Sequence, residues 1–256
     1  MANYEPHYYE YAGVGTGWDA FPRRNVIDYI REKGEHPLKI LDVGCGTAEI
    51  LSRLGQNISY TGIERSSYAV REARAKWKED SRSIAFVARE CPPLEFEDAS
   101  FDGALLLFSL EHVRDPKGLL RECARVLKRG GFLIVLAPNL EFPLAWPTAL
   151  RHKSFLYRAW FHIVRMRDYV LRLVGFSAFR VVKENFTDRT GRYERKDDDL
   201  RVLISSWEVM RFLKAQGLSL AEFWKERDVH GLRCFAQKLP ALQWYGGTLA
   251  AAFRKS

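Results

Sequence analysis

Short apolar runs and amphipathic segments alternate along residues 21–137 of this 256-residue chain. Apolar runs bounded by turn residues are typical of buried strands, and apolar positions three or four residues apart are typical of helices. These patterns predict five strands, at residues 38–43, 58–64, 85–88, 101–108 and 132–137. They also predict helices, at residues 21–33, 47–54, 66–78 and 115–129. Continuously apolar strands that alternate with helices indicate a parallel sheet covered on both sides.

The alternation stops after the fifth predicted strand and returns near residue 205. Ser205-Ser206-Trp207-Glu208 has the form of a capping box, which predicts a helix that runs to about residue 216. Apolar runs at 218–224 and 232–237 then predict two closing strands that form a hairpin. The tail, 239–256, carries no pattern to which we assign an element.

Composition narrows the class of protein without naming one. The chain is 47% hydrophobic and 28% charged, which is ordinary for a globular domain. Its four cysteines form no Cys-x-x-Cys pair, so we expect reduced thiols, no structural zinc and a cytoplasmic location. We see neither a secretory signal nor an apolar run long enough to span a membrane. The net charge of +8 is concentrated in residues 151–183, which hold eight basic residues and one acid.

One stretch combines the residues of a ligand-binding turn. The first predicted strand ends in Asp42 and is followed by Gly44 and Gly46, and the second ends in Glu64. Open α/β sheets bind ligands where strands end in such turns, and glycines let the backbone approach a ligand closely. A nicotinamide dehydrogenase would need Gly-x-Gly-x-x-Gly, but position 49 is Glu, so we disfavour that interpretation.

The order of these segments resembles the class I S-adenosylmethionine-dependent methyltransferases, in their ubiquinone- and menaquinone-type small-molecule branch. The resemblance is carried by residues 40–47, 94–102, 110–116 and 120–131. It covers about residues 38–139 and returns more weakly over 205–238. It implies an α/β, Rossmann-like, doubly wound and mostly parallel seven-stranded sheet. A helical or irregular insertion would lie between the fifth strand and the last helix.

The resemblance also implies S-adenosyl-L-methionine as cofactor and assigns roles to single residues. Asp42 would accept hydrogen bonds near the cationic methionine end, and Glu64 would bind the ribose hydroxyls. The remaining cofactor-binding candidates are Gly44, Cys45 and Gly46 in the loop, Arg65 next to Glu64, Glu90 and Cys91 at the adenine, and Phe108 and Ser109 near the methyl group. Two departures stand out: Ala48 replaces a third glycine, and Glu90, before Pro92-Pro93, replaces the usual Asp, which leaves Arg89 as an alternative adenine contact. We expect Cys45 to be a small buried side chain rather than a reactive thiol.

His112 is the candidate general base, because it follows the fourth strand on the ligand side of the sheet, and histidine is the residue type most often suited to proton transfer near neutral pH. A histidine that only caps a turn or packs beside the cofactor is the favoured alternative. The predicted enzyme is a methyltransferase for a small-molecule, saccharide or lipid-linked acceptor, with oxygen the expected methylated atom. Transfer to nitrogen or carbon, aminopropyl transfer and nucleoside binding without turnover stay open.

We interpret residues 1–256 as a single domain with an N-terminal lid and helix at 1–35. The cofactor-binding core would comprise 36–140 and 205–238, and the substrate-side insertion 141–204. In that insertion Leu156, Trp160, Ile163, Val170 and Val174 recur at helical spacing, with Arg158, Arg165 and Arg172 elsewhere on the helix.

Three interpretations of residues 151–183 stay open. The first, which we favour, is a cover helix whose apolar side packs on the sheet domain. The second is docking on an anionic inner membrane surface, and the third is binding of an acidic acceptor. We expect no nucleic-acid partner and no metal, and interpret Asp197–Asp199 as a solvated turn. The sequence leaves the oligomeric state open.

Overall fold

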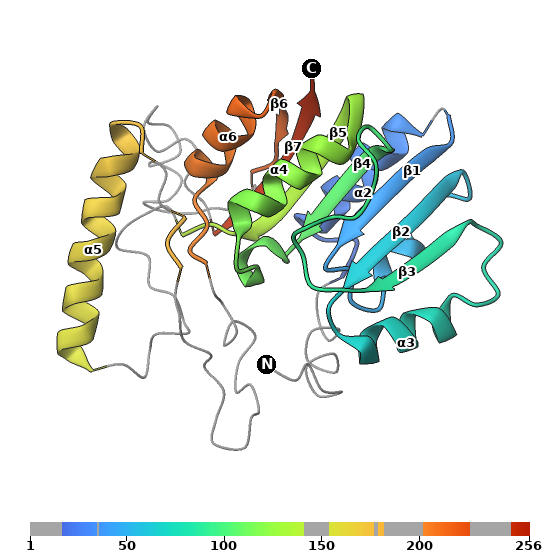
Figure 1. Ribbon diagram of the computed structural model, residues 1–256, viewed down its shortest axis with the longest axis horizontal. Helices are drawn as coiled ribbons and strands as arrows, with labels where there is room; N and C mark the ends of the chain where they lie inside the picture. The colour runs from blue at the N-terminus through green and yellow to red at the C-terminus, as the bar shows by residue number, and fades with distance from the viewer. Residues whose placement is uncertain (1–16, 35, 141–153, 177–178, 182–201, 226–246) are drawn as a thin grey trace.

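The computed structural model describes residues 17–34, 36–140, 154–176, 179–181, 202–225 and 247–256 (Figure 1). Its centre is a seven-stranded sheet with the order β3-β2-β1-β4-β5-β7-β6. The strands are β1 (Leu38–Val43), β2 (Ile58–Glu64), β3 (Ile84–Ala88), β4 (Phe101–Leu107), β5 (Leu127–Pro138), β6 (Leu218–Phe223) and β7 (Thr248–Lys255). Strands β1 to β5 pair in parallel, and β7 runs antiparallel to both of its neighbours. The predicted doubly wound, mostly parallel sheet is therefore confirmed.

Helices cover both faces of this sheet (Figure 1). The α-helices are α2 (Arg23–Lys33), α3 (Ser67–Lys76), α4 (Pro116–Val126), α5 (Phe155–Leu173) and α6 (Ser206–Ala215). One buried cluster joins α4 and α6 to residues of β4, β5 and β7, while a second joins α2 and α3 to the opposite face. The alternation of inward and outward side chains along β4 and β5 produces both cores from the same strands.

Local signals explain where the helices begin. Ser66 Oγ accepts a hydrogen bond from Ala69 N, and Ser205 Oγ accepts one from Glu208 N, as N-cap serines do. Asp115 caps α4 in the same way and precedes its first residue, Pro116.

Two expectations differ from the structure in detail, and a third falls on residues that it does not describe. Residues 47–54 were expected to form a helix, but only a 3₁₀ turn, η1 (Glu49–Ser52), forms there. The fifth strand begins at Leu127, so the glycines at 130–131 lie inside the strand rather than before it. The predicted strand at 232–237 lies outside the described residues. The antiparallel partner of β6 is β7, from the tail to which the sequence assigned no element.

Helix α5 forms where its spacing predicted it, but with the opposite face inward. The favoured interpretation, an apolar side packed on the sheet domain, is wrong for this helix. Exposed side chains occupy the five apolar positions of the predicted stripe: Leu156, Trp160, Ile163, Val170 and Val174. Its buried residues are Phe161, Arg165, Asp168 and Arg172. Charged groups therefore attach α5 to the rest of the protein, because they find partners there.

Candidate cofactor and active site

The loop after β1 is held against β2 and against the end of β4. Gly44 N donates to Ile63 O at 2.8 Å, and Gly44 has a φ of +82°, which an L side chain rarely adopts. A Cβ on Gly44 would lie 2.5 Å from Ser109 Cβ, so only glycine fits this contact between the two loops. Ala48, at the position of the missing third glycine, adopts a φ of +57° and is fully buried.

Glu64 ties this loop to the start of α3. Its Oε2 accepts a hydrogen bond from Gly46 N at 3.1 Å, and its Oε1 accepts one from Ser66 N at 2.9 Å. The side chain is buried, yet each carboxylate oxygen has two lone pairs and can accept a further hydrogen bond. The structure thus places an acceptor-rich carboxylate beside the glycine loop, where the sequence expected the ribose contact.

Asp42 lies beneath the loop in a fully buried position. Its Oδ2 accepts a hydrogen bond from the Tyr60 hydroxyl at 2.7 Å, while Oδ1 has no hydrogen-bond partner within the described part of the chain. Burial raises the pKa of Asp42 to about 7; the Tyr60 hydrogen bond acts against this rise, and the charge of Glu64 adds to it. A buried acceptor without a donor marks a place for a ligand donor.

Cys45 is packed beside these acids and is unsuited to act as a nucleophile. A Cβ on Gly62 would lie 2.7 Å from Cys45 Sγ, so the missing side chain at Gly62 makes room for the sulfur. Burial, followed by the charges of Asp42 and Glu64, raises the pKa of the Cys45 thiol well above its ordinary value. Since the thiolate is the reactive form, this environment favours an inert cysteine. The side chain is half-buried, whereas the sequence analysis expected it to be buried.

The adenine-side candidates lie beside Glu64 but are more open. Arg89 N donates to Glu64 O at 2.9 Å, which brings the segment after β3 against the end of β2. The Glu90 carboxylate is exposed and faces Arg114, with Oε1 at 3.5 Å from Nε. Cys91 is half-buried, and burial raises the pKa of its thiol to about 11. Arg65, half-buried, lies between Glu64 and the N-cap Ser66.

Phe108 and Ser109 form the β4 side of the same edge. Phe108 has a φ of +59°, unusual for a residue with a Cβ, and its N–H donates to Leu136 O. Such strain is typical of functional loops. Ser109 Oγ is buried and, like Asp42 Oδ1, has no hydrogen-bond partner among the described residues.

The sequence analysis missed two neighbours of this edge, Tyr60 and Arg23, whereas Trp18 was expected either to cover a site or to pack on the surface. Tyr60 lies on β2 and looks like an ordinary core position in the strand pattern. The Arg23 guanidinium lies 5.7 Å from the centre of the Phe108 ring and 5.2 Å from that of Trp18, and burial lowers the pKa of Arg23. No spacing signal links the start of α2 to the end of β4, so only the fold could bring them together.

His112 ends a short 3₁₀ turn, η2 (Leu110–His112), that follows Ser109. Its side chain is mostly buried, and Nε2 lies 3.8 Å from Oε1 of the buried Glu111. The Glu111 carbonyl accepts a hydrogen bond from Val202 N, so the chain returning from the insertion packs against this turn. The turn therefore places His112 beyond the end of β4, at the edge where the glycine loop lies.

Two negative findings concern only the residues that the structure describes. Within them, no three His, Cys, Asp or Glu side chains come close enough together to hold a metal ion. Asp197–Asp199 lie outside this part of the chain. None of the described helices combines the length and the apolar character needed to cross a membrane.

Comparisons with known proteins agree with this geometry. The profile of the family described as "Methyltransferase domain" matches residues 41–135. The O-methyltransferase rstn1 of Aspergillus nomiae is 32% identical over 185 residues, which cover 67% of this chain and 80% of that protein. The demethylmenaquinone methyltransferase of Thermotoga maritima is 34% identical over 127 residues, which cover 48% of this chain and 51% of that protein. The chain spans about half the length of this and a further curated relative.

A solved structure extends the likeness to the fold. A S-adenosylmethionine-dependent methyltransferase from Mesorhizobium loti superposes with a TM-score of 0.58 at 15% identity, and the match covers 93% of this chain and 100% of that one. The sheet order, the glycine loop and the two acids define the class I, Rossmann-like methyltransferase fold. The chain belongs to the methyltransferase domain family, whose cofactor is S-adenosylmethionine.

The residues present fit that cofactor. Asp42 Oδ1 offers a buried acceptor that lacks a donor, and Glu64 offers further lone pairs beside a loop that only glycine can form. S-adenosylmethionine has a cationic amino group and two ribose hydroxyls. These groups are hydrogen-bond donors of the kind that the unused acceptor positions of Asp42 and Glu64 can bind.

Proposed function

We propose that this protein transfers a methyl group from S-adenosylmethionine to an oxygen atom of a small-molecule acceptor. The observation that carries the proposal is the pair of buried acids, Asp42 and Glu64, on either side of the Gly44–Gly46 turn. The names of two relatives, an O-methyltransferase and a demethylmenaquinone methyltransferase, support small-molecule acceptors, including lipid-linked ones.

The chain's own residues would divide the work as follows. Asp42 holds the amino group of the methionine end, Glu64 the ribose, and the 89–91 segment the adenine. Phe108 and Ser109 position the methyl end, since Ser109 lies against Gly44 of the glycine loop and Phe108 precedes Ser109. When bound, the cofactor supplies an activated methyl group, so alignment of the acceptor oxygen does most of the remaining work.

His112 is the group we propose to remove the acceptor's proton. It lies at the ligand edge of the sheet, and a positioned base contributes about 10²–10⁴-fold to such a reaction. The Oε1 atom of the buried Glu111 lies 3.8 Å from Nε2 of His112, so a carboxylate stands beside the imidazole. The N-terminal segment 1–35, through Arg23 and Trp18, and the insertion 141–204 would enclose the acceptor.

The first experiment separates turnover from binding. Calorimetry should show S-adenosylmethionine binding, and S-adenosylhomocysteine should be released with at least one acceptor among phenols, catechols, prenylated quinols and sugar nucleotides. Absence of binding at millimolar cofactor would contradict the cofactor site. Binding without release across the panel would favour the nucleoside-binding alternative over an enzyme.

The second experiment tests the base. His112→Asn should lower kcat by about 10² or more while cofactor affinity stays the same. His36→Asn is the matched control, because His36 is exposed and precedes β1 at the opposite edge of the sheet. An undiminished rate in His112→Asn would assign the histidine to packing alone.

A further inference from the structure

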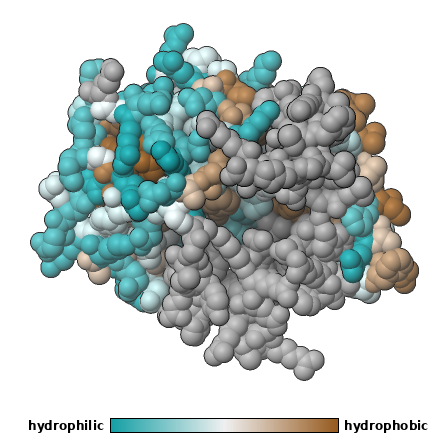
Figure 2. Space-filling view, turned by 180° about the vertical axis from the view of Figure 1, so that it is seen from behind, coloured by the Kyte–Doolittle hydropathy of each residue, from teal (hydrophilic) through white to brown (hydrophobic). Residues whose placement is uncertain are grey.

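The outward side of α5 forms an apolar surface, which we call the α5 face. Its side chains are between 46% and 80% exposed, far above a core residue. The α5 face consists of Phe155, Leu156, Trp160, Ile163, Met166, Val170, Leu173, Val174 and Phe176. Helix α5 lies at the left of Figure 1 and therefore at the right of Figure 2, which shows the molecule from behind. Brown, hydrophobic side chains gather along that right-hand edge (Figure 2). Patches of this kind on a soluble domain mark interaction sites.

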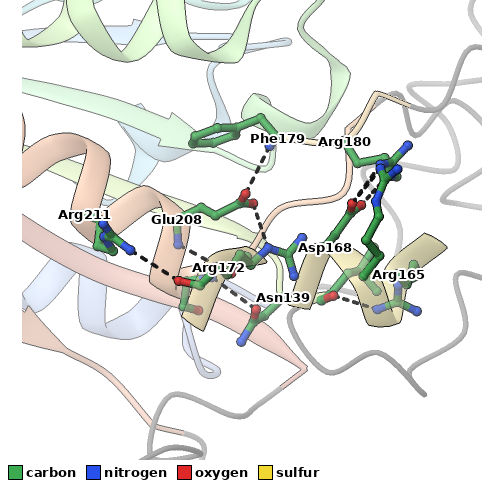
Figure 3. A network of polar contacts seen from close by, with 12 residues as sticks. Asn139, Arg165, Asp168, Arg172, Phe179, Arg180, Glu208 and Arg211 are labelled. Carbon is green, nitrogen blue, oxygen red and sulfur yellow. Dashed lines mark hydrogen bonds and ion pairs between the residues drawn. The ribbon is translucent and has the colours of Figure 1, made fainter. Parts of the chain in front are cut away.

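The inward side of α5 is fixed by polar contacts, so the apolar side cannot simply turn inward. Arg165 Nη2 donates to Leu140 O at 2.7 Å, and the Arg172 guanidinium lies 3.3 Å from Glu208 Oε2 on α6. Asp168 pairs with Arg180 on the strand-like segment beside it, and Arg211 donates to the Arg172 carbonyl (Figure 3). Rotation of the helix would separate these charges from their partners and leave the buried Glu208 carboxylate without Arg172, which is costly.

The charges around the α5 face have one sign. Arg158 and Arg167 are exposed on the helix, whereas its acid, Asp168, is buried and paired with Arg180 and Arg167. Among the described residues of α5, exposed cations therefore flank an apolar surface without an exposed acid. Amphipathic helices that lie on anionic bilayers combine these same features, an apolar face and basic side chains at its margin.

We propose that the α5 face docks on an anionic lipid surface, with its apolar side chains in the headgroup boundary and Arg158 and Arg167 at lipid phosphates. A second copy of the chain fits less well, because a symmetric pairing of two α5 faces would bring exposed arginines together with no exposed acid on the helix to offset them. The proposal does not depend on methyl transfer, since docking needs neither cofactor nor acceptor.

The position of α5 gives such docking a consequence. Arg165 binds the carbonyl of Leu140, two residues after the end of β5, so α5 lies beyond the carboxyl ends of the parallel strands. This is the edge that carries the glycine loop and His112. Docking through the α5 face would therefore bring the acceptor side of the domain close to the lipid surface.

Flotation of the full chain with vesicles tests the proposal. Vesicles of phosphatidylcholine and phosphatidylglycerol, at 70:30, should carry the protein upward, and vesicles of phosphatidylcholine alone should carry much less. The double variant Leu156→Gln/Ile163→Gln should lower the partition coefficient at least about tenfold, because two inserted side chains lose their burial. Arg158→Gln/Arg167→Gln should lower it about fivefold per arginine, on the anionic vesicles only.

Leu220→Gln is the matched control, since Leu220 is an exposed apolar side chain on β6, away from α5. It should float like the unmodified protein, and circular dichroism should show that all variants are folded. The proposal is wrong if the unmodified protein stays at the bottom with anionic vesicles, or if both double variants float as well as it does. It is also wrong if ultracentrifugation shows a dimer that Leu156→Gln/Ile163→Gln dissociates while no vesicle binding occurs.

Discussion

Buried charged residues differ in their partners between two regions: α5 and the edge of the sheet that carries the glycine loop, which we call the cofactor edge. At the cofactor edge, buried Asp42 and Glu64 retain unused acceptor positions, which suit a ligand. On α5, the buried Arg165, Asp168 and Arg172 are engaged by the protein itself, and the apolar side chains face outward. The comparison teaches that burial of charge has two different meanings. A buried charged group that lacks a hydrogen-bond donor indicates a ligand-binding site. A buried charged group whose partners come from the protein itself attaches one element to another.

The largest expected effect is a loss of stability when the ion pair that attaches α5 to α6 is removed. Glu208→Ala removes the partner of Arg172 and the acceptor of the Phe179 N–H at 3.1 Å, so the free energy of unfolding should fall by about 3–5 kcal/mol. Urea unfolding followed by circular dichroism measures it. Ile163→Gln, on the outward side, should change stability by no more than about 0.5 kcal/mol. Equal costs for the two variants would contradict the inverted orientation of α5.

The next effect concerns the cofactor edge. Glu64→Ala removes both the ribose acceptor and the support of Gly46 N and Ser66 N, so the Kd for S-adenosylmethionine should rise about 10–100-fold. Calorimetry measures this, with the midpoint of thermal unfolding as a check that the domain is folded. Glu90→Ala is the control: its carboxylate is exposed and faces Arg114, and the Kd should change less than about threefold. A larger effect at Glu90 than at Glu64 would reverse the assignment.

The smallest effect is the pH dependence of the same binding. The folded pKa of Asp42, about 7, exceeds its ordinary value, so below about pH 7 the neutral carboxyl is the favoured form in the cofactor-free fold. Its contribution to stability is present below about pH 4 and is lost as the pH rises through about 7. A cationic amino group favours the carboxylate, so cofactor affinity should rise with pH between about 5.5 and 7.5, by at most about tenfold per unit.

Two variants sharpen this test. Tyr60→Phe removes the hydrogen bond that lowers the pKa of Asp42, so the rise in affinity should move to higher pH. Asp42→Asn should abolish the pH dependence, weaken binding, and raise the midpoint of thermal unfolding at pH 8 by a few degrees, because position 42 then carries no buried charge. A pH profile that is unchanged in Asp42→Asn would assign the titration to another group.

Much of the cofactor edge could be predicted because its signals are local. Asp42, Gly44 and Gly46 lie within five residues, and Glu64 ends the next strand, so the strand pattern alone places them together. Tyr60 was not predicted as part of the site, because an aromatic residue on a buried strand has the appearance of core. Its hydroxyl matters only through Asp42, and that pairing depends on the parallel register of β1 and β2.

The orientation of α5 could not be predicted, although its existence could. Helical spacing defines two sides of the helix but does not say which one faces the protein. That choice is made by Leu140, Arg180 and Glu208, which lie outside the helix in sequence and offer partners to its charges. The strand β7 was not predicted for another reason. Its run of alanines at 250–252 has little strand propensity, so its conformation is determined by burial in the sheet.

The place of β7 has a consequence for the order in which the domain forms. Among the described strands, β6 is joined to the sheet through β7 alone. β7 pairs with β5 from Phe132↔Arg254 to Pro138↔Thr248, partners that lie 122 and 110 residues apart in the chain. Contacts of such long sequence separation form slowly, because a large loop must close first. We therefore expect β1 to β5 to pair early and the β7–β6 edge to be the last part of the sheet to form. During synthesis, β1 to β5, which carry the cofactor edge, can therefore pair before the ribosome has released β7.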